Sequence, residues 1–198
     1  MLNAYENDAK VGELTQGLMA AGQRIFQIFQ RESEAEHARF LLAEFAPRHG
    51  AMVLDVGCGV GEVARLMKEM RPDLNFILLN ISATQLALCP PEFDRIHAGV
   101  ESIPLPDQSV DAVMACYVLG HADKEKALAE MRRVLKPGGI LFIYDVRGGA
   151  MPELGYTAHD WEGAEPDGLN TDAFDKLYPG FAERHPAVRP VLVREIQC

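Results

Sequence analysis

Three glycines alternate with other residues in a stretch that could hold a nucleotide-like ligand. The stretch VLDVGCGVGE runs from Val53 to Glu62 and carries an acidic residue, Asp55, just before the glycines. An apolar run precedes the glycines, and apolar residues follow at i, i+3, i+4 and i+7, which predicts a strand, a tight loop and an amphipathic helix. Glycine tolerates positive φ and lets a ligand approach the backbone. Open α/β sheets bind nucleotides at such loops.

The spacing of the glycines indicates which kind of nucleotide fits. The dinucleotide fingerprint needs a glycine at its sixth place, where this sequence has Glu62. A carboxylate in the first helical turn suits the helix dipole but repels a phosphate arriving there. The spacing therefore favours a ligand with an adenosine part and no phosphate. The alternative is a glycine-rich turn that binds nothing, which is disfavoured because strand, loop and helix all fall where a site needs them.

A second motif, RVLKPGGILF, runs from Arg133 to Phe142. Together the two motifs resemble the class I S-adenosylmethionine (SAM)-dependent methyltransferases, and the resemblance covers residues 53–147, about half of the chain. It implies a Rossmann-like α/β fold: a doubly wound, mostly parallel sheet with helices on both faces, an N-terminal helical cap and a shortened C-terminal hairpin. It also implies SAM as cofactor and transfer of a methyl group by in-line displacement to an O, N or C atom of a small molecule.

Asn80 follows the predicted strand 76–79 at the place where this family usually has an aspartate or glutamate that binds the ribose. Neutral hydrogen bonds are weaker than charged ones, so Asn80 should weaken cofactor binding about tenfold without abolishing it. The alternative is an asparagine that merely ends a strand in a turn. The segment 99–107 resembles the family's adenine-crossing segment, but Gly99 replaces a frequent aspartate, which leaves adenine contacts to Val100 and Glu101.

The complete set of expected cofactor contacts extends over the ends of several predicted strands. It comprises Asp55, Gly57, Cys58, Gly59, Gly61, Asn80, Ile81, Gln85, Val100, Glu101 and Cys116. No metal site is expected, because the four cysteines show neither a C-x-x-C spacing nor another metal-ligand pattern.

Methyl transfer from a sulfonium needs alignment more than acid–base catalysis. A general base matters only for a hydroxyl, a thiol or an acidic carbon, and the candidate is His121, just beyond the predicted strand 110–116. The alternative is a histidine that only hydrogen-bonds the backbone. Tyr144, Asp145 and Arg147, at the end of the predicted strand 140–146, could hold the acceptor; for Arg147 the alternative is a solvated charge.

Composition limits the partners. The net charge of −10 argues against a nucleic-acid backbone or an anionic membrane surface, since both need a basic face. No apolar run is long enough to span a bilayer, and the polar first ten residues do not look like a signal peptide. Unpatterned cysteines suit reduced thiols, so a cytoplasmic location is expected.

The chain divides into an expected helical cap or lid, residues 1–50, and a SAM-binding α/β domain, residues 51–198. Residues 1–12 are predicted as coil and residues 13–30 as a helix weakened by two glycines; a capping box of Ser33 and Glu36 starts a second helix. Both helices could be plain core cover, or the first could be a lid. The pattern predicts further helices over residues 83–89, with Ser82 as its cap, over 123–135, with Asp123 as its cap, and over 172–178. It also predicts strands over 95–98 and 188–196.

Pro190 suits an edge position in the last strand, and no room is left for the second strand of a terminal hairpin. The sheet then ends early or a partner chain covers its edge, for example in a homodimer. Two other functions stay open. One is a non-catalytic SAM-binding or assembly subunit with an eroded site, indicated by Asn80, Gly99 and the short C-terminus. The other, less favoured, is a nicotinamide-dependent oxidoreductase.

Overall fold

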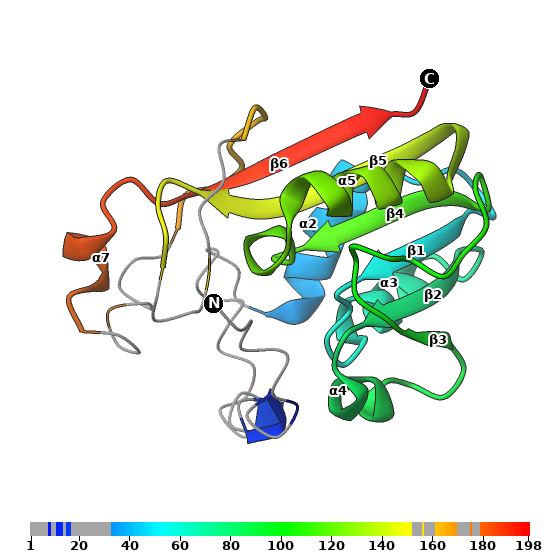
Figure 1. Cartoon of the computed structure of the whole chain (residues 1–198), viewed down its shortest axis with the longest axis horizontal. Helices are drawn as coiled ribbons and strands as arrows, with labels where there is room; N and C mark the ends of the chain where they lie inside the picture. The colour runs from blue at the N-terminus through cyan, green and yellow to red at the C-terminus, as the bar shows by residue number, and fades with distance from the viewer. Residues whose placement is uncertain are drawn as a thin grey trace.

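A computed structural model of the 198-residue chain describes residues 8, 11–13, 15–16, 33–151, 156, 161–169, 175 and 179–198. Within these residues a six-stranded sheet has the order β3-β2-β1-β4-β5-β6 (Figure 1). The strands are β1 Met52–Val56, β2 Asn75–Asn80, β3 Asp94–His97, β4 Val110–Cys116, β5 Leu135–Arg147 and β6 Arg189–Ile196. β1 to β5 run parallel and β6 runs antiparallel to β5. The expected mostly parallel sheet is confirmed.

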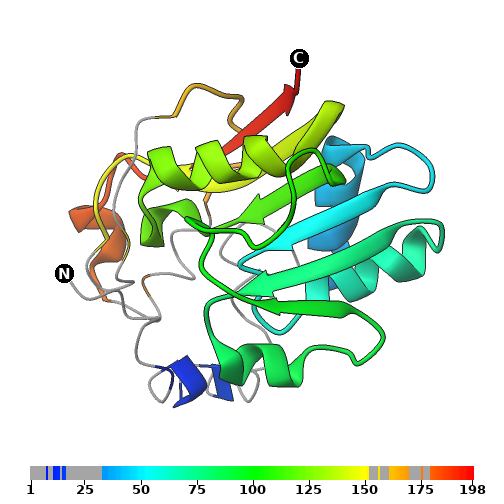
Figure 2. The same ribbon diagram turned by 45° about the vertical axis from the view of Figure 1, so that its right-hand side comes forward.

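Helices cover both faces of this sheet. α2 (Glu34–Phe45), α3 (Glu62–Met70) and α4 (Ala83–Leu88) pack into one core cluster, and α5 (Lys124–Val134) packs into another on the opposite face. Figures 1 and 2 show α5 in front of the sheet and α2 behind it. Side chains alternate along a strand, so Val53 joins the first cluster and Leu54 the second. The doubly wound arrangement follows from this alternation.

The structure confirms the predicted starts of the helices, which depend on capping residues close in the sequence. Ser33 Oγ accepts a hydrogen bond from Glu36 N at 3.3 Å, and Glu36 Oε2 accepts one from Ser33 N at 3.1 Å, which is the predicted capping box. Ser82 caps α4 and Asp123 caps α5. α2 buries Ala38, Leu41 and Phe45 against the sheet, so this second helix is core cover.

The predicted coil at residues 1–12 is wrong where the structure describes it, because Asp8, Val11 and Gly12 are helical. Contacts with the rest of the chain explain the difference. Val11 is buried, and the Asp8 carboxylate accepts hydrogen bonds from Ser82 Oγ at 2.6 Å and Thr84 Oγ1 at 2.7 Å. Figures 1 and 2 both place this N-terminal piece beside α4. Most of the predicted helix 13–30, and with it the lid, lies outside the described residues.

The region after α5 differs from the prediction. The KPGG sequence does not form a free turn: β5 begins at Leu135, directly after α5, and the register with β4 shifts between Val110 and Ala112. Gly138, with φ 73°, donates to Gln197 O at 2.8 Å, so the strand reaches its partner across this irregular stretch. Helix and strand follow without a linker because the irregular stretch absorbs the change of direction.

At the C-terminal end β6 forms the edge of the described sheet, as Pro190 predicts. The chain itself covers part of this edge, since Ala164 and Leu192 exchange backbone hydrogen bonds of 3.0 and 2.7 Å. A homodimer at this edge stays a prediction. α7 (Phe181–Arg184) was not predicted, and of the predicted helix 172–178 only Asp175, which is helical, lies within the described residues. None of the described helices is both long enough and apolar enough to cross a bilayer.

Candidate functional site

β1, β2 and β4 are parallel neighbours, so their carboxyl ends lie together along one end of the sheet, which is the carboxyl edge. Val56 pairs with Leu79 and with Ala115, so the residues that follow all three strands lie close together. The glycine loop, Asn80 and the loop after Cys116 are therefore neighbours. This is the edge at which parallel sheets hold ligands.

The glycine loop is built from three left-handed residues. Gly57, Gly59 and Gly61 have φ values of 67°, 58° and 75°. A Cβ at Gly57 would lie 2.3 Å from Val118 Cγ2, and one at Gly61 would lie 2.9 Å from Leu78 Cδ1. A Cβ at Gly59 would meet none of the described residues within 4 Å. The first and third glycines are thus needed for packing, whereas the second leaves open space that a ligand can use.

The helix that begins at Glu62 does not present an unpaired carboxylate. Arg65 donates to both carboxylate oxygens of Glu62, at 2.7 and 2.6 Å, and also to Glu69 at 2.5 Å. Burial and the nearby Glu62 raise the pKa of Glu34, which shows that acidic groups from α2 and α3 gather here. The ion pair with Arg65 therefore weakens the argument that Glu62 repels phosphate. Glu34 and Glu69 still add acidic groups near the start of the helix.

Asp55 is a buried carboxyl at this edge. Its residue is 4% exposed, and burial first, then Cys89, raises its pKa to about 8. Within the described part of the chain no group hydrogen-bonds this carboxyl. A carboxyl with this pKa is mostly protonated at pH 7, and a cation beside it would favour the charged form. Asp55 is thus suited to receive a positively charged ligand group.

Asn80 is 4% exposed and its amide is engaged by its own chain. Asn80 Nδ2 donates to Gly59 O at 3.2 Å and to Gln85 Oε1 at 2.8 Å, and Asn80 Oδ1 accepts from Ser82 N at 3.2 Å. Gln85 Nε2 in turn donates to Thr15 Oγ1 at 2.9 Å. Asn80 therefore ties the glycine loop to α4 and to the N-terminal segment, and its remaining capacity is one lone pair on Oδ1.

The neighbouring expected contacts differ in exposure. Ile81 is 40% exposed at the end of β2. Val100 is buried in the second core cluster, so its backbone, and not its side chain, is the part that a ligand can contact. Glu101 Oε1 accepts a hydrogen bond from Asp123 N at 2.5 Å, which directs this carboxylate toward the start of α5.

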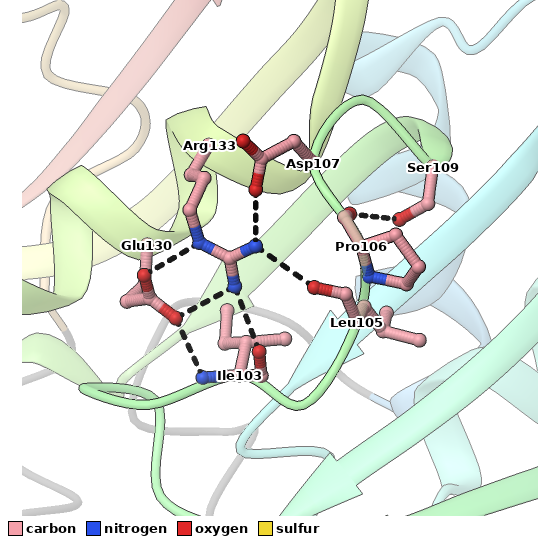
Figure 3. Close-up of polar contacts among 7 residues, drawn as sticks. All are labelled: Ile103, Leu105, Pro106, Asp107, Ser109, Glu130 and Arg133. Carbon is pink, nitrogen blue, oxygen red and sulfur yellow. Dashed lines mark hydrogen bonds and ion pairs between the residues drawn. The ribbon is translucent and has the colours of Figure 1, made fainter.

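Arg133 holds the segment that follows Glu101, a role that sequence reasoning missed (Figure 3). Its guanidinium donates to Glu130, to Asp107 and to the carbonyl oxygens of Ile103 and Leu105, at 2.7 to 2.8 Å. Glu130 also accepts from Ile103 N at 2.8 Å. The signal in the sequence was the arginine of the RVLKPGG motif, but three of its partners, Ile103, Leu105 and Asp107, lie 26 to 30 residues earlier.

Two of the three predicted acceptor residues on β5, Tyr144 and Asp145, are buried in the core. Asp145 is fully buried; it accepts hydrogen bonds from Leu119 N at 3.2 Å and Val146 N at 2.8 Å, and burial raises its pKa to about 7. Tyr144 is 1% exposed in the core, and Arg147 forms an ion pair with Glu165. The prediction that Tyr144 and Asp145 hold the acceptor is wrong; Asp145 instead positions the loop after β4.

That loop carries His121 in a 3-10 turn, Leu119–His121. His121 N donates to Val118 O at 3.0 Å, and its ring packs edge-on against Tyr156 with centroids 5.2 Å apart. A Cβ at Gly120 would lie 2.0 Å from Tyr156 Cζ, so glycine is needed for this contact. The assignment of His121 as a general base stays a prediction, and nothing in the sequence pointed to Tyr156 as its neighbour.

Cys116 and Tyr117 complete the exit of β4. Burial and the nearby Asp55 raise the pKa of the Cys116 thiol well above its usual value, so it stays protonated. Tyr117 has a positive φ of 58°, and its hydroxyl lies 3.5 Å from Nε2 of the buried His37 on α2. Across the described ranges no three His, Cys, Asp or Glu side chains form a group that could hold a metal ion.

Residues 54–143 match the family model of a methyltransferase domain. These residues are a methyltransferase domain. The match begins in β1 and ends in β5, so it contains the glycine loop, Asn80 and the exit of β4. Together with the relatives that follow, this match supports the resemblance of residues 54–143 to the class I SAM-dependent methyltransferases that the two sequence motifs indicate.

Among the similar proteins is the ubiquinone/menaquinone biosynthesis C-methyltransferase UbiE of Hahella chejuensis, 31% identical over 118 residues, which are 54% of this chain and 47% of the relative. The chain spans about half the length of the curated relatives it matches. The structure of geranyl diphosphate C-methyltransferase from Streptomyces coelicolor superimposes with a TM-score of 0.69 at 13% identity, covering 83% of this chain and 81% of that one. The [4+2]-cyclase SpnF gives 0.65 at 18% identity, covering 82% and 80%. These two likenesses show the fold.

Proposed function

We propose that the methyltransferase domain binds SAM at the glycine loop and transfers its methyl group to an O, N or C atom of a small molecule. The observation that carries this proposal is that, among the described residues, nothing covers the face of Gly59 and nothing hydrogen-bonds the buried carboxyl of Asp55 on the preceding strand. A ligand with a compact, positively charged end fits this pair. The relative from Streptomyces coelicolor was solved with S-adenosylhomocysteine (SAH), which supports the choice of cofactor.

The chain's own groups divide the work of holding this cofactor. Asp55 would accept the ammonium of the amino-acid end, and the backbone around Gly59 would face the rest of that end. Asn80 Oδ1 has one lone pair left for a ribose hydroxyl, which is less than a carboxylate offers. Backbone groups of Val100 and Glu101 would face the adenine, and Arg133 holds the segment that follows them through the carbonyl oxygens of Ile103 and Leu105. When bound, SAM supplies a methyl group that is already activated by a sulfonium.

Alignment is then the main contribution of the chain to the reaction. Orienting two reactants accounts for about 7–11 kcal/mol of barrier lowering in favourable cases. The loop after β4 is well held for this purpose, since Asp145 accepts from its backbone and Tyr156 packs on Gly120. His121 is the candidate base on that loop for an acceptor that must lose a proton. The C-methyltransferase relatives make carbon one acceptor atom to test first.

A matched pair of glycine variants tests the cofactor site. Gly59→Ala and Gly50→Ala place the same methyl group at similar φ values, 58° and 72°, with nothing within 4 Å of either Cβ. Both should cost about 1 kcal/mol of stability through backbone strain. Gly50 lies at the other end of β1, so only Gly59→Ala should weaken SAH binding in isothermal titration. Unmeasurable SAH and SAM binding to the wild type, or equal losses in both variants, would contradict the proposal.

A non-catalytic SAM-binding or assembly subunit is the second candidate. It is favoured by the Asn80 amide, whose two N–H groups are already used, and by Gly99 where relatives often have an aspartate. The fold itself does not decide, since the chain superimposes on a protein described as a cyclase. SAH binding without methyl transfer to a panel of quinol, sterol, prenyl diphosphate and carboxylate acceptors would support this candidate.

A further inference from the structure

Two of the four cysteines meet at the glycine loop. Cys58 lies within the loop and Cys89 caps the end of α4, and both thiols lie 3.6 Å from the same acceptor, Gly59 O. The Cys89 sulfur also lies 3.3 Å from the position that a Cβ on Gly61 would take. All four cysteines are free thiols, and only Cys198 is exposed. The pair therefore joins β1, through its loop, to the helix that follows β2.

The Gly59 carbonyl cannot satisfy every donor that surrounds it. A carbonyl oxygen has two lone pairs, and Asn80 Nδ2 already donates to it at 3.2 Å. At most one of the two thiols can then donate to this oxygen at a time. Cys89 has a second acceptor, Gln85 O at 3.6 Å. The two thiols thus compete for one carbonyl oxygen, which places both sulfur atoms on the same side of the glycine loop.

The local charges decide which sulfur carries the thiolate. The hydrogen bond between the thiols lowers the pKa of Cys89, opposed by burial and assisted by Arg95, and the same bond and burial raise the pKa of Cys58. Arg95 Nη1 lies close by, donating to Leu86 O at 3.0 Å and Cys89 O at 3.4 Å. When the pair loses a proton, the negative charge therefore resides on Cys89, while Cys58 is the more exposed partner.

We propose that Cys58 and Cys89 are a reversible oxidation site, at which a hydroperoxide forms a disulfide that closes the glycine loop. The site itself follows from the two sulfur positions around Gly59. The effect of the disulfide on SAM binding rests on the proposed function. A disulfide needs an S–S distance of about 2.05 Å, which draws Cys58, and with it the loop from Gly57 to Gly61, toward α4. The face of Gly59 that a ligand would use moves with it.

The chemistry balances with hydrogen peroxide as the oxidant. The Cys89 thiolate attacks one peroxide oxygen, the O–O bond breaks, and the leaving hydroxide takes up a proton to give water and a sulfenic acid on Cys89. The Cys58 sulfur then attacks the sulfenic sulfur, the S–S bond forms as the S–O bond breaks, and the proton from Cys58 completes a second water. The two thiols lose two electrons in total and the peroxide gains them. A dithiol reductant reverses the reaction.

The test uses the full chain carrying Cys198→Ser, which removes the exposed thiol and its intermolecular disulfides. The protein is treated with a small excess of hydrogen peroxide, alkylated under denaturing conditions and digested for mass spectrometry. We expect a linked peptide pair that contains Cys58 and Cys89, its disappearance after dithiothreitol, and an alkylated Cys116. Adding Cys58→Ser or Cys89→Ser to this background should each abolish the linked pair.

Isothermal titration with SAH then measures the consequence. We expect affinity to fall at least tenfold on oxidation, to recover on reduction, and not to change with peroxide in the Cys89→Ser variant. Two thiols that both stay alkylatable after peroxide, or a link of Cys58 to Cys116, would overturn the site. A disulfide that leaves SAH affinity unchanged would overturn its control of the loop. Absence of SAH binding in the reduced protein would count against the proposed function alone, because the linked peptide is measured without any ligand.

Discussion

Replacing Asp55 by asparagine should stabilise the ligand-free protein, and increasingly so as the pH rises. The carboxyl is 4% exposed and its pKa is raised to about 8, chiefly by burial. In the unfolded chain an aspartate titrates near pH 4. Between pH 4 and pH 8 the folded protein therefore holds a proton that the unfolded chain has already lost, so the free energy of unfolding falls as the pH rises through this window.

The magnitude follows from the width of that window. Each pH unit within it removes about 1.4 kcal/mol of stability, which amounts to about 4 kcal/mol at pH 7. Asparagine has a similar shape and carries no charge at any pH. The difference in unfolding free energy between Asp55→Asn and the wild type should therefore grow by about 3 kcal/mol from pH 5 to pH 7 and level off above pH 8.

Urea unfolding of both proteins at pH 5, 6, 7, 8 and 9 measures this difference. Asp145, whose pKa is raised to about 7, adds its own pH dependence to both proteins and cancels when the two are subtracted. A difference that stays constant from pH 5 to pH 7 would refute the reasoning, because it would mean that Asp55 ionises normally in the folded protein. A variant that is less stable than the wild type at every pH would refute it as well.

The same carboxyl links protons to the proposed cofactor. If the ammonium of SAH requires the charged form of Asp55, binding at pH 7 must release about one proton. Titrations in buffers of different ionisation enthalpy measure that release, which should vanish in Asp55→Asn together with most of the affinity. The stabilised variant would then be the weaker binder, which is the pattern expected when a buried charge is kept for function.

Three further substitutions address the surroundings of the site. Arg133→Ala should lower the unfolding free energy by about 2 kcal/mol, measured by urea unfolding, and should weaken SAH binding. The control is its neighbour Arg132, which forms an exposed ion pair; replacing it should lower the unfolding free energy by under about 1 kcal/mol. Asn80→Asp should weaken SAH binding in titration about tenfold, the reverse of what the family's acidic residue at this place suggests, because a carboxylate would face Gly59 O and lose both donated hydrogen bonds. A tighter complex would contradict this. His121→Gln should slow methyl transfer at least about 100-fold at unchanged SAH affinity, and an unchanged rate would leave His121 as a backbone-bonded residue.

Sequence reasoning worked where the cause is local. The capping box of Ser33, the caps at Ser82 and Asp123, and the strand–loop–helix unit around Gly59 each depend on residues a few positions apart. Such patterns act before any tertiary contact forms, so the sequence alone is enough to find them. The doubly wound, mostly parallel sheet with helices on both faces then followed from the resemblance of two motifs.

Sequence reasoning did not find the contacts of a residue whose partner lies far along the chain. Asp145 looked like an acceptor ligand at a strand end, but the structure buries it under the loop after β4. The sequence did not show that Gly59 and Gln85 engage the Asn80 amide, and Asn80 as a ribose ligand stays a prediction. Arg133 lay in a recognised motif, yet its partners became visible only in the fold.

By itself, then, the sequence determined that this chain has a glycine loop after a buried strand, and that the loop belongs to a methyltransferase domain. Glycine spacing and apolar periodicity carry this information without any knowledge of distant contacts. The tertiary structure decided the chemistry around the loop: the desolvation that raises the pKa of Asp55, and the meeting of Cys58 with Cys89 at Gly59 O. Parallel crossovers bring these groups together from separate strands, and burial is a property of the assembled core, so neither can be read from residue types in a row.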